Sequence, residues 1–311
     1  MAAATKMPPA HGLDGAVCFE HHVTSPFTSP DCRELLRAAR VMPGDRVLDL
    51  ASGTGVVARA AARRVGRRGR VVALDPSGPL LGYGRQIAAS DAATAEIVFQ
   101  KGDPGSLPFE DEAFDVVLYQ QALRRPLTDP ATLDELRRVL RPGGRIAFAL
   151  LREIGHSPFH HVLARAIQRY GAASVAAGIC APFPMDDAES VRRTLEHLEF
   201  RELRVRNRIL KVRYSPALEA SVRGCLRALH LGHWYERLPP AERAAFLREV
   251  ARGLAPCRDA LGFAIPAGYR MLRAAKPVLC PRNLPSLWVR TAHRPARPGP
   301  AQADKLVSKS K

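Results

Sequence analysis

Short apolar runs alternate with amphipathic stretches over the first half of the chain. Apolar residues follow one another, as in strands covered on both faces, over residues 46–50, 70–75, 96–100, 113–119 and 145–151. Between these runs, apolar residues recur at helical spacing, as through Leu133, Leu136 and Leu140. The alternation predicts an α/β fold with a doubly wound, mostly parallel sheet.

The pattern is less regular outside this region. Helical spacing recurs over residues 29–39, 157–170, 186–198, 215–229 and 239–254. Apolar and polar residues alternate over 200–214, which predicts one or two strands, and a final strand is expected within 261–275. At both ends of the chain apolar spacing lapses, so we expect disorder there.

A glycine turn joins the first predicted strand to the helix that follows it. Gly53 and Gly55 let the backbone turn tightly and approach a ligand without interference from a Cβ atom. The first N–H groups of the helix starting at Val56 would face that ligand. Four polar residues stand at or just after predicted strand ends: Asp49, Asp75, Asp103 and Tyr119. Because the carboxyl ends of parallel strands meet at one edge, we expect them to converge there.

Two classes of ligand fit this turn. The segment from Gly53 to Ala58 satisfies the dinucleotide fingerprint G-x-G-x-x-A, with Asp75 at the spacing of a ribose-binding acid. Asp49 argues against a dinucleotide, because its carboxylate would repel a pyrophosphate. S-adenosylmethionine has no phosphate and presents an ammonium and a sulfonium, which a carboxylate attracts. We therefore expect S-adenosylmethionine, and a nicotinamide-dependent oxidoreductase is kept as an alternative.

The motifs over residues 46–151 resemble, in order, those of the class I S-adenosylmethionine-dependent methyltransferases. The similarity is greatest to the small-molecule branch of the quinone-biosynthesis type, the methyltransferase type 11 domain. Residues 47–55 resemble the first motif, 72–77 the second, 102–109 the third and 114–121 the fourth. The resemblance implies a Rossmann-like sheet with a last antiparallel strand and added helices over the acceptor pocket.

The resemblance also implies a cofactor site, made of Asp49, Ala51, Ser52, Gly53, Gly55, Asp75, Pro76, Asp103, Pro104 and Gln120. Asp75 would chelate the ribose hydroxyls, and Asp103 would accept from the adenine amino group. The fourth motif, with Gln120, would lie beside the methionine part of the cofactor. The alternative to these ligand contacts is a purely structural role, in strand-end turns for Asp49 and Asp75 and in an Asx turn for Asp103.

The acceptor side offers candidates rather than a motif. Gln121, His233 and Trp234 are candidate substrate-binding residues, with core packing as the alternative for Trp234. No catalytic residue is evident; His160, His161 and Tyr119 are candidates for a general base, and a loop histidine in solvent is the alternative. A base is needed only if the acceptor is protonated at the working pH.

The resemblance suggests a division of the chain into four parts. Residues 1–40 would form an N-terminal tail and lid helices, and 41–151 the S-adenosylmethionine-binding core. Residues 152–275 would supply acceptor-side helices and closing strands, and 276–311 a basic, largely disordered tail.

Composition adds a question of charge. The formal net charge is +17, which fits either an RNA- or membrane-seeking surface or an Arg-rich composition spread along the chain; we adopt the second interpretation. The six cysteines show no metal-ligand spacing, so neither a metal site nor disulfides are expected. With no signal peptide and no apolar run near the ~18 residues of a membrane span, we expect a cytoplasmic protein.

The sequence thus predicts an enzyme that methylates a small organic acceptor at O, N or C, in secondary metabolism or quinone-like biosynthesis. The alternatives are an RNA or protein methyltransferase and a non-catalytic cofactor-binding relative. Nucleic-acid methylases of amino groups carry two prolines and an aromatic residue after the fourth strand, where this chain reads Tyr119-Gln-Gln-Ala122. We therefore expect no nucleic-acid partner. Oligomeric state stays open.

Overall fold

The strands of the described residues form one eight-stranded sheet in the order β3-β2-β1-β4-β5-β8-β6, with β7 paired to β8 at the side. Their bounds are β1 Arg46–Leu50, β2 Arg70–Asp75, β3 Ile97–Lys101, β4 Phe114–Gln120, β5 Leu140–Leu151, β6 Arg201–Tyr214, β7 Arg258–Asp259 and β8 Gly262–Ala275. The first five strands are parallel, and β8 runs antiparallel to both β5 and β6. This confirms the doubly wound, mostly parallel sheet with a last antiparallel strand.

The structure is a computed structural model and describes residues 12–21, 29–90, 95–120, 129–181, 183, 188–214, 218–229 and 231–278. All of them belong to the unit Met1–Val278. The helices are α1 Gly12–Phe19, α2 Ser29–Ala38, α3 Val56–Val65, α4 Gly78–Ala88, α5 Pro130–Val139, α6 Pro158–Arg169, α7 Ala173–Cys180, α8 Ala188–His197, α9 Leu218–Ala228, α10 Gly232–Arg237 and α11 Pro240–Gly253.

Helices cover both faces of the sheet. On one face, α2, α3 and α4 pack against the side chains of alternate strand residues such as Val47, Ala73 and Leu118. On the other, α5 and α8 pack against residues of opposite parity such as Leu48 and Val117. Successive strand residues point to opposite faces, so parity decides which side of the sheet each polar residue at a strand end reaches.

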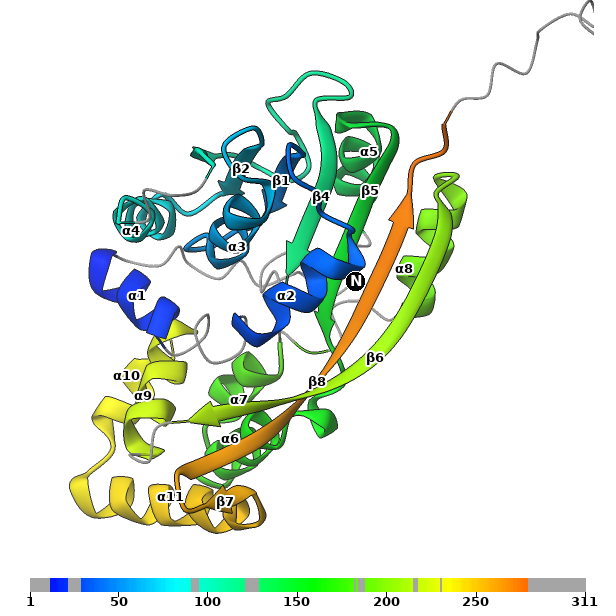
Figure 1. Cartoon of the computed structure of the whole chain (residues 1–311). Coiled ribbons are helices and arrows are strands. Elements are labelled where there is room, and N and C mark those ends of the chain that lie inside the picture. The colour runs from blue at the N-terminus through cyan, green and yellow to red at the C-terminus, as the bar shows by residue number, and fades with distance from the viewer. Residues whose placement is uncertain are drawn as a thin grey trace, which may run out of the picture. The chain divides into compact units, whose positions relative to one another are not determined.

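The long strands β6 and β8 continue past the parallel part of the sheet to the later helices (Figure 1). Their far ends carry a second core, in which Val212 and Tyr214 of β6 and Ile265 of β8 pack with residues of α6, α7, α9 and α11. Helices α6, α7, α9 and α11 therefore form a layer at one end of this strand pair.

Two helices were not predicted, α7 and α10, and α1 was expected only as one of the lid helices within residues 1–40. The fifth strand also starts earlier than expected, at Leu140 rather than Arg145. Its pairing with β4 jumps from Leu140 opposite Phe114 to Arg145 opposite Val116, so residues 141–144 bulge out at the place where a turn was expected. The sequence located the turn but not the strand residue before it.

Candidate active site

Two carboxylates lie on one face of the sheet where β1 and β2 end. Asp49 and Asp75 share the parity of Ala73 and therefore point to the α3 side. Asp49 is 1% exposed, and its Oδ2 accepts from the backbone N–H of Ala58 at 2.8 Å. Burial raises the pKa of Asp49 to about 8, and the negative charge of Asp75 adds to this.

Asp75 ties the glycine turn to the end of β2. Its Oδ2 accepts from the N–H of Gly53 at 2.9 Å and its Oδ1 from the N–H of Ser77 at 2.8 Å. Both carboxylates therefore hold backbone amides around the same turn, and Asp75 is 7% exposed. The two acidic groups lie in one site, as expected.

The turn itself requires glycine at two positions. Gly53 and Gly55 have φ of +57° and +76°, a region that other residues rarely adopt. A Cβ on Gly55 would lie 2.7 Å from Cε1 of Phe99, so a side chain there would collide with β3. Ala51 also has a positive φ, of 55°, and the N–H of Ser52 donates to Leu74 O at 3.0 Å.

Two serine hydroxyls at this edge are buried without a hydrogen bond to any described residue. They are the Oγ atoms of Ser52 and Ser77. Buried polar atoms are normally satisfied, so these hydroxyls fit a site that completes its hydrogen bonds with a polar ligand. Sequence reasoning missed Ser77, although it directly follows the Asp75-Pro76 pair.

Helix α1 lies over the turn. The Phe19 ring is 3.1 Å from the position a Cβ of Gly53 would take. Glu20 Oε1 accepts from Arg59 Nη2 at 2.6 Å, and its Oε2 accepts from the hydroxyl of Thr54. The side chains of Arg59 and Glu20 are only 8% and 12% exposed. No pattern in the sequence indicates this contact, because α1 is short and lacks clear apolar spacing.

The polar residues at the end of β4 point to opposite faces. Gln120 is 7% exposed on the face of Asp49, and its Oε1 accepts from Cys32 Sγ of α2 at 3.7 Å. Tyr119 has the other parity and packs in the core on the α5 side, edge-on to Phe148. The strand end therefore brings Gln120, but not the ring of Tyr119, to the carboxylates.

Asp103 lies after β3 with an exposed side chain. Its Oδ1 accepts from the N–H of Gly105 at 2.7 Å, which is the Asx turn foreseen as the alternative to a ligand contact. Pro104 is buried and Pro76 is exposed. The side chain of Asp103 therefore shapes the backbone of the third motif.

Sequence and structure comparisons agree with this geometry. Residues 47–144 match the sequence model of a methyltransferase domain. A 2-phytyl-1,4-naphtoquinone methyltransferase of Synechococcus elongatus is 36% identical over 138 residues, 44% of this chain and 58% of that protein. A demethylmenaquinone methyltransferase of Symbiobacterium thermophilum is 39% identical over 113 residues, 36% of this chain and 45% of that protein. This chain spans about half the length of these curated relatives.

Residues 47–144 are therefore similar to a methyltransferase domain. The sequence relatives of the chain are of the quinone-biosynthesis type. A solved structure of Haemonchus contortus phosphoethanolamine N-methyltransferase 2 in complex with S-adenosyl-L-methionine has a TM-score of 0.53 at 17% identity. That likeness covers 85% of this chain and 57% of the other, and it shows a common fold.

The acceptor-side candidates on the later helices are more dispersed than the residues at the glycine turn. His160 of α6 packs against the rings of Phe159 and Phe183, and burial lowers the pKa of His160 to about 4. His161 beside it is half-buried, and His233 of α10 is exposed.

Trp234 lies edge-on to Tyr170 and Phe246, so it packs between helices, as its alternative interpretation held. Gln121 lies outside the described residues.

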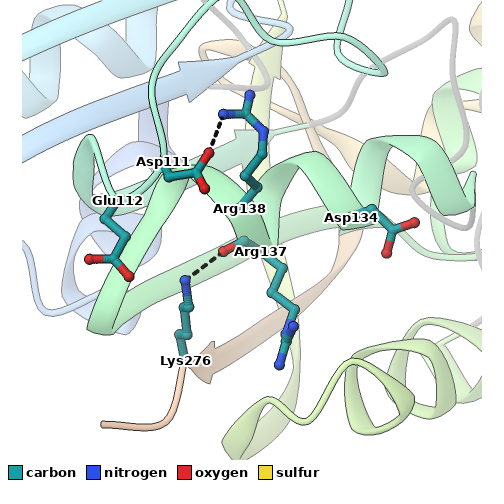
Figure 2. Close-up of a pocket in the computed structure, with 6 residues that line it drawn as sticks. All are labelled: Asp111, Glu112, Asp134, Arg137, Arg138 and Lys276. Carbon is teal, nitrogen blue, oxygen red and sulfur yellow. Dashed lines mark hydrogen bonds and ion pairs between the residues drawn. The ribbon is translucent and has the colours of Figure 1, made fainter. Parts of the chain in front are cut away.

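One hollow of about 380 Å³ lies away from the glycine turn. Figure 2 shows its lining, with Asp111 and Glu112 just before β4 and Lys276 just after β8. Because β4 is parallel to β1, this is the opposite edge of the sheet. Lys276 Nζ donates to the backbone oxygens of Arg137 and Leu140 at 2.9 and 2.6 Å, which caps the end of α5. The ammonium group of Lys276 in this hollow therefore caps the C-terminal end of α5.

The described residues hold no cluster of three or more metal-ligating side chains. Nor does this part of the chain include a helix long and apolar enough to cross a bilayer.

Proposed function

We propose that this protein transfers the methyl group of S-adenosylmethionine to a small organic acceptor. The observation that carries the proposal is the pairing of Asp49 and Asp75 on one face of the sheet at a glycine turn. A cationic ligand favours the ionised form of the buried Asp49 carboxyl and gains its attraction, whereas a pyrophosphate would oppose that ionisation, which is the choice between the two ligand classes that fit the turn.

The residues around the turn fit this cofactor. Asp75, at the end of β2, would accept from ribose hydroxyls, and the hydroxyls of Ser52 and Ser77 have hydrogen bonds left to make. Gln120 lies on the same face for the methionine part. Ala51, Gly53 and Gly55 would shape the backbone of the site, and Pro76, Asp103 and Pro104 would flank the adenosine.

S-adenosylmethionine, when bound, supplies a methyl group that its sulfonium charge already activates. The chain must then hold the acceptor in line with the carbon–sulfur bond and keep water away. Such positioning lowers a barrier by roughly 7–11 kcal/mol at its best. Helix α1, held over the turn by the pair Glu20–Arg59, is one element that excludes water.

The acceptor is proposed to be a quinone-like or other small ring compound, on the strength of the relatives' names. If it carries a proton at the working pH, His161 is the better candidate for a general base. His160 has a pKa of about 4, so it is neutral at pH 7 but only a weak base.

We assign residues 41–151 to cofactor binding and 152–275 to the acceptor. The N-terminal segment 1–40 provides the lid, and 276–311 is assigned no role in methyl transfer.

Incubation with isotope-labelled S-adenosylmethionine and a metabolite extract of the host cell tests the proposal. Mass spectrometry should find a small molecule that gains one labelled methyl group. Label found only in RNA or protein, or cofactor bound with no labelled product of any kind, would overturn it.

A further inference from the structure

Five arginines meet on the α2 face of the β6–β8 edge: Arg40, Arg204, Arg206, Arg208 and Arg273, named here the arginine patch. Arg204, Arg206 and Arg208 alternate along β6, so their side chains share one face at a spacing of about 7 Å. Arg204 lies directly opposite Arg273 of β8, and Arg206 lies opposite Met271, which packs in the α2-side core. Arg40 follows α2 on that same face.

The charge of the patch is hardly compensated. No described residue forms a hydrogen bond or an ion pair with the guanidinium groups of Arg204, Arg206 or Arg208. Glu202 is the carboxylate in reach, at 3.9 Å from Arg40. Burial and the charges of Arg40, Arg204 and Arg206 lower the pKa of the Arg273 guanidinium, and Glu202 offsets this only in part.

Other arginines of the same two strands have acidic partners. Arg213, near the end of β6, pairs with Asp259 at 3.0 Å, and Arg270, opposite Asn207, pairs with Glu153 at 3.2 Å. The patch therefore differs from its neighbours on β6 and β8 in gathering several arginines with one carboxylate in reach.

Protection of an edge strand does not account for the patch. A few charges along β6 would already prevent pairing with another strand. That role requires neither a single sign of charge nor the convergence of Arg273 from the inner strand β8 and Arg40 from α2. Holding like charges together is unfavourable unless an anionic partner offsets it.

We propose that the arginine patch docks this protein on an anionic lipid surface. β6 ends the sheet, so its free edge can approach a flat surface along its length. Val205 and Ile209 of β6 are 39% and 66% exposed and point to the other face of the strand, so the edge of β6 carries cations along one side and aliphatic side chains along the other. Basic residues attract anionic headgroups, and exposed aliphatic side chains enter the headgroup boundary.

Single-stranded RNA is the competing polyanion and fits the surface less well. Sequence-tolerant RNA binding uses aromatic side chains on which bases stack. The described residues of β6 include one aromatic ring, Tyr214, and it is 4% exposed. The edge of β6 offers cations on one face and aliphatic groups on the other, which suit a bilayer.

Co-sedimentation of the full chain with vesicles of phosphatidylglycerol and phosphatidylcholine tests the inference. The triple variant Arg204→Gln, Arg206→Gln, Arg208→Gln should lose affinity by about 100-fold, because each basic residue near an anionic leaflet contributes roughly a fivefold factor. A Lys triple at the same positions should bind within about threefold of the unmodified chain. Vesicles of phosphatidylcholine alone should bind neither variant.

The matched control is Arg67→Gln, Arg68→Gln, Arg70→Gln, which removes the same charge from exposed residues at β2. β2 lies five strands from β6, roughly 24 Å away, so this variant should keep its vesicle affinity. Equal losses in the two Gln variants, no loss in the patch variant, or binding to RNA but not to vesicles would each overturn the inference.

Methyl transfer is not part of the vesicle assay. S-adenosylhomocysteine affinity, measured on the same samples, shows that the variants are folded and tests the cofactor site separately. If the Gln triple fails to bind S-adenosylhomocysteine, the inference is tested instead by the vesicle affinity of the Lys triple and by the salt dependence of vesicle binding in the unmodified chain. Vesicle binding that does not weaken as salt rises contradicts the inference.

Discussion

Asp49→Asn should change how the stability of the protein depends on pH. Asp49 is fully buried, and its pKa is raised to about 8, so the folded chain keeps this carboxyl protonated at pH 7. In the unfolded chain the carboxyl ionises near pH 4. Between these values the folded state binds one proton more than the unfolded state, so the contribution of Asp49 to stability falls as pH rises.

The magnitude follows from the proton count. One proton of difference costs ~1.4 kcal/mol per pH unit. Over pH 5 to 7 the unfolded carboxyl is ionised and the folded one is not, so the free energy of unfolding should fall by about 2.7 kcal/mol through Asp49. Asn has the same shape, can still accept from the N–H of Ala58 and does not titrate.

Urea unfolding of both proteins at pH 5, 6 and 7, without cofactor, checks this. The difference in unfolding free energy between the original chain and Asp49→Asn should shift by about 2.7 kcal/mol in favour of Asn across the range. The part of this difference that is the same at every pH reports how the introduced amide of the variant packs and not the charge of Asp49. A difference that stays constant with pH would show that Asp49 is ionised in the folded state, and the reasoning about its burial would be wrong.

Other substitutions test the elements around the turn. Gly55→Ala should lose about 2–4 kcal/mol in urea unfolding, because its backbone is left-handed and the new Cβ meets Phe99. Gly82→Ala, in the interior of α4 with no neighbour within 4 Å, should instead gain about 0.5–1 kcal/mol; similar effects of both would contradict the clash. Glu20→Gln should speed amide hydrogen exchange in α1 roughly tenfold or more, because it breaks the buried pair with Arg59. Unchanged exchange in α1 would show that this pair does not hold the helix.

The parallel part of the fold was predictable because its signals are local. β1, β2 and β4 are short, continuous apolar runs, and glycines mark the turn at Gly53 and Gly55. The position of Asp49 and Asp75 at one edge follows from the parallel order of the strands alone. Which face each strand-end residue reaches needs the register, and this is why Tyr119 was grouped with the carboxylates although its ring points to the other side.

The cover of the site was expected only in general, as lid helices within residues 1–40, and its contacts could not be predicted. Helix α1 has eight residues, and it is held by contacts distant in sequence, such as Glu20 with Arg59. The arginine patch is likewise created by pairing, because Arg204 and Arg273 are adjacent only once β6 and β8 are aligned. In the sequence, Arg204 and Arg273 are only two members of a general excess of arginine.

Calorimetric titration of S-adenosylhomocysteine into the original chain and into Asp75→Ala tests the central claim most directly. Asp134→Ala, an exposed carboxylate at the far edge of the sheet, is the control. Loss of the ribose contacts should weaken binding by roughly 10- to 100-fold in Asp75→Ala and leave Asp134→Ala unchanged. Equal affinity in all three proteins would contradict a cofactor site at the end of β2.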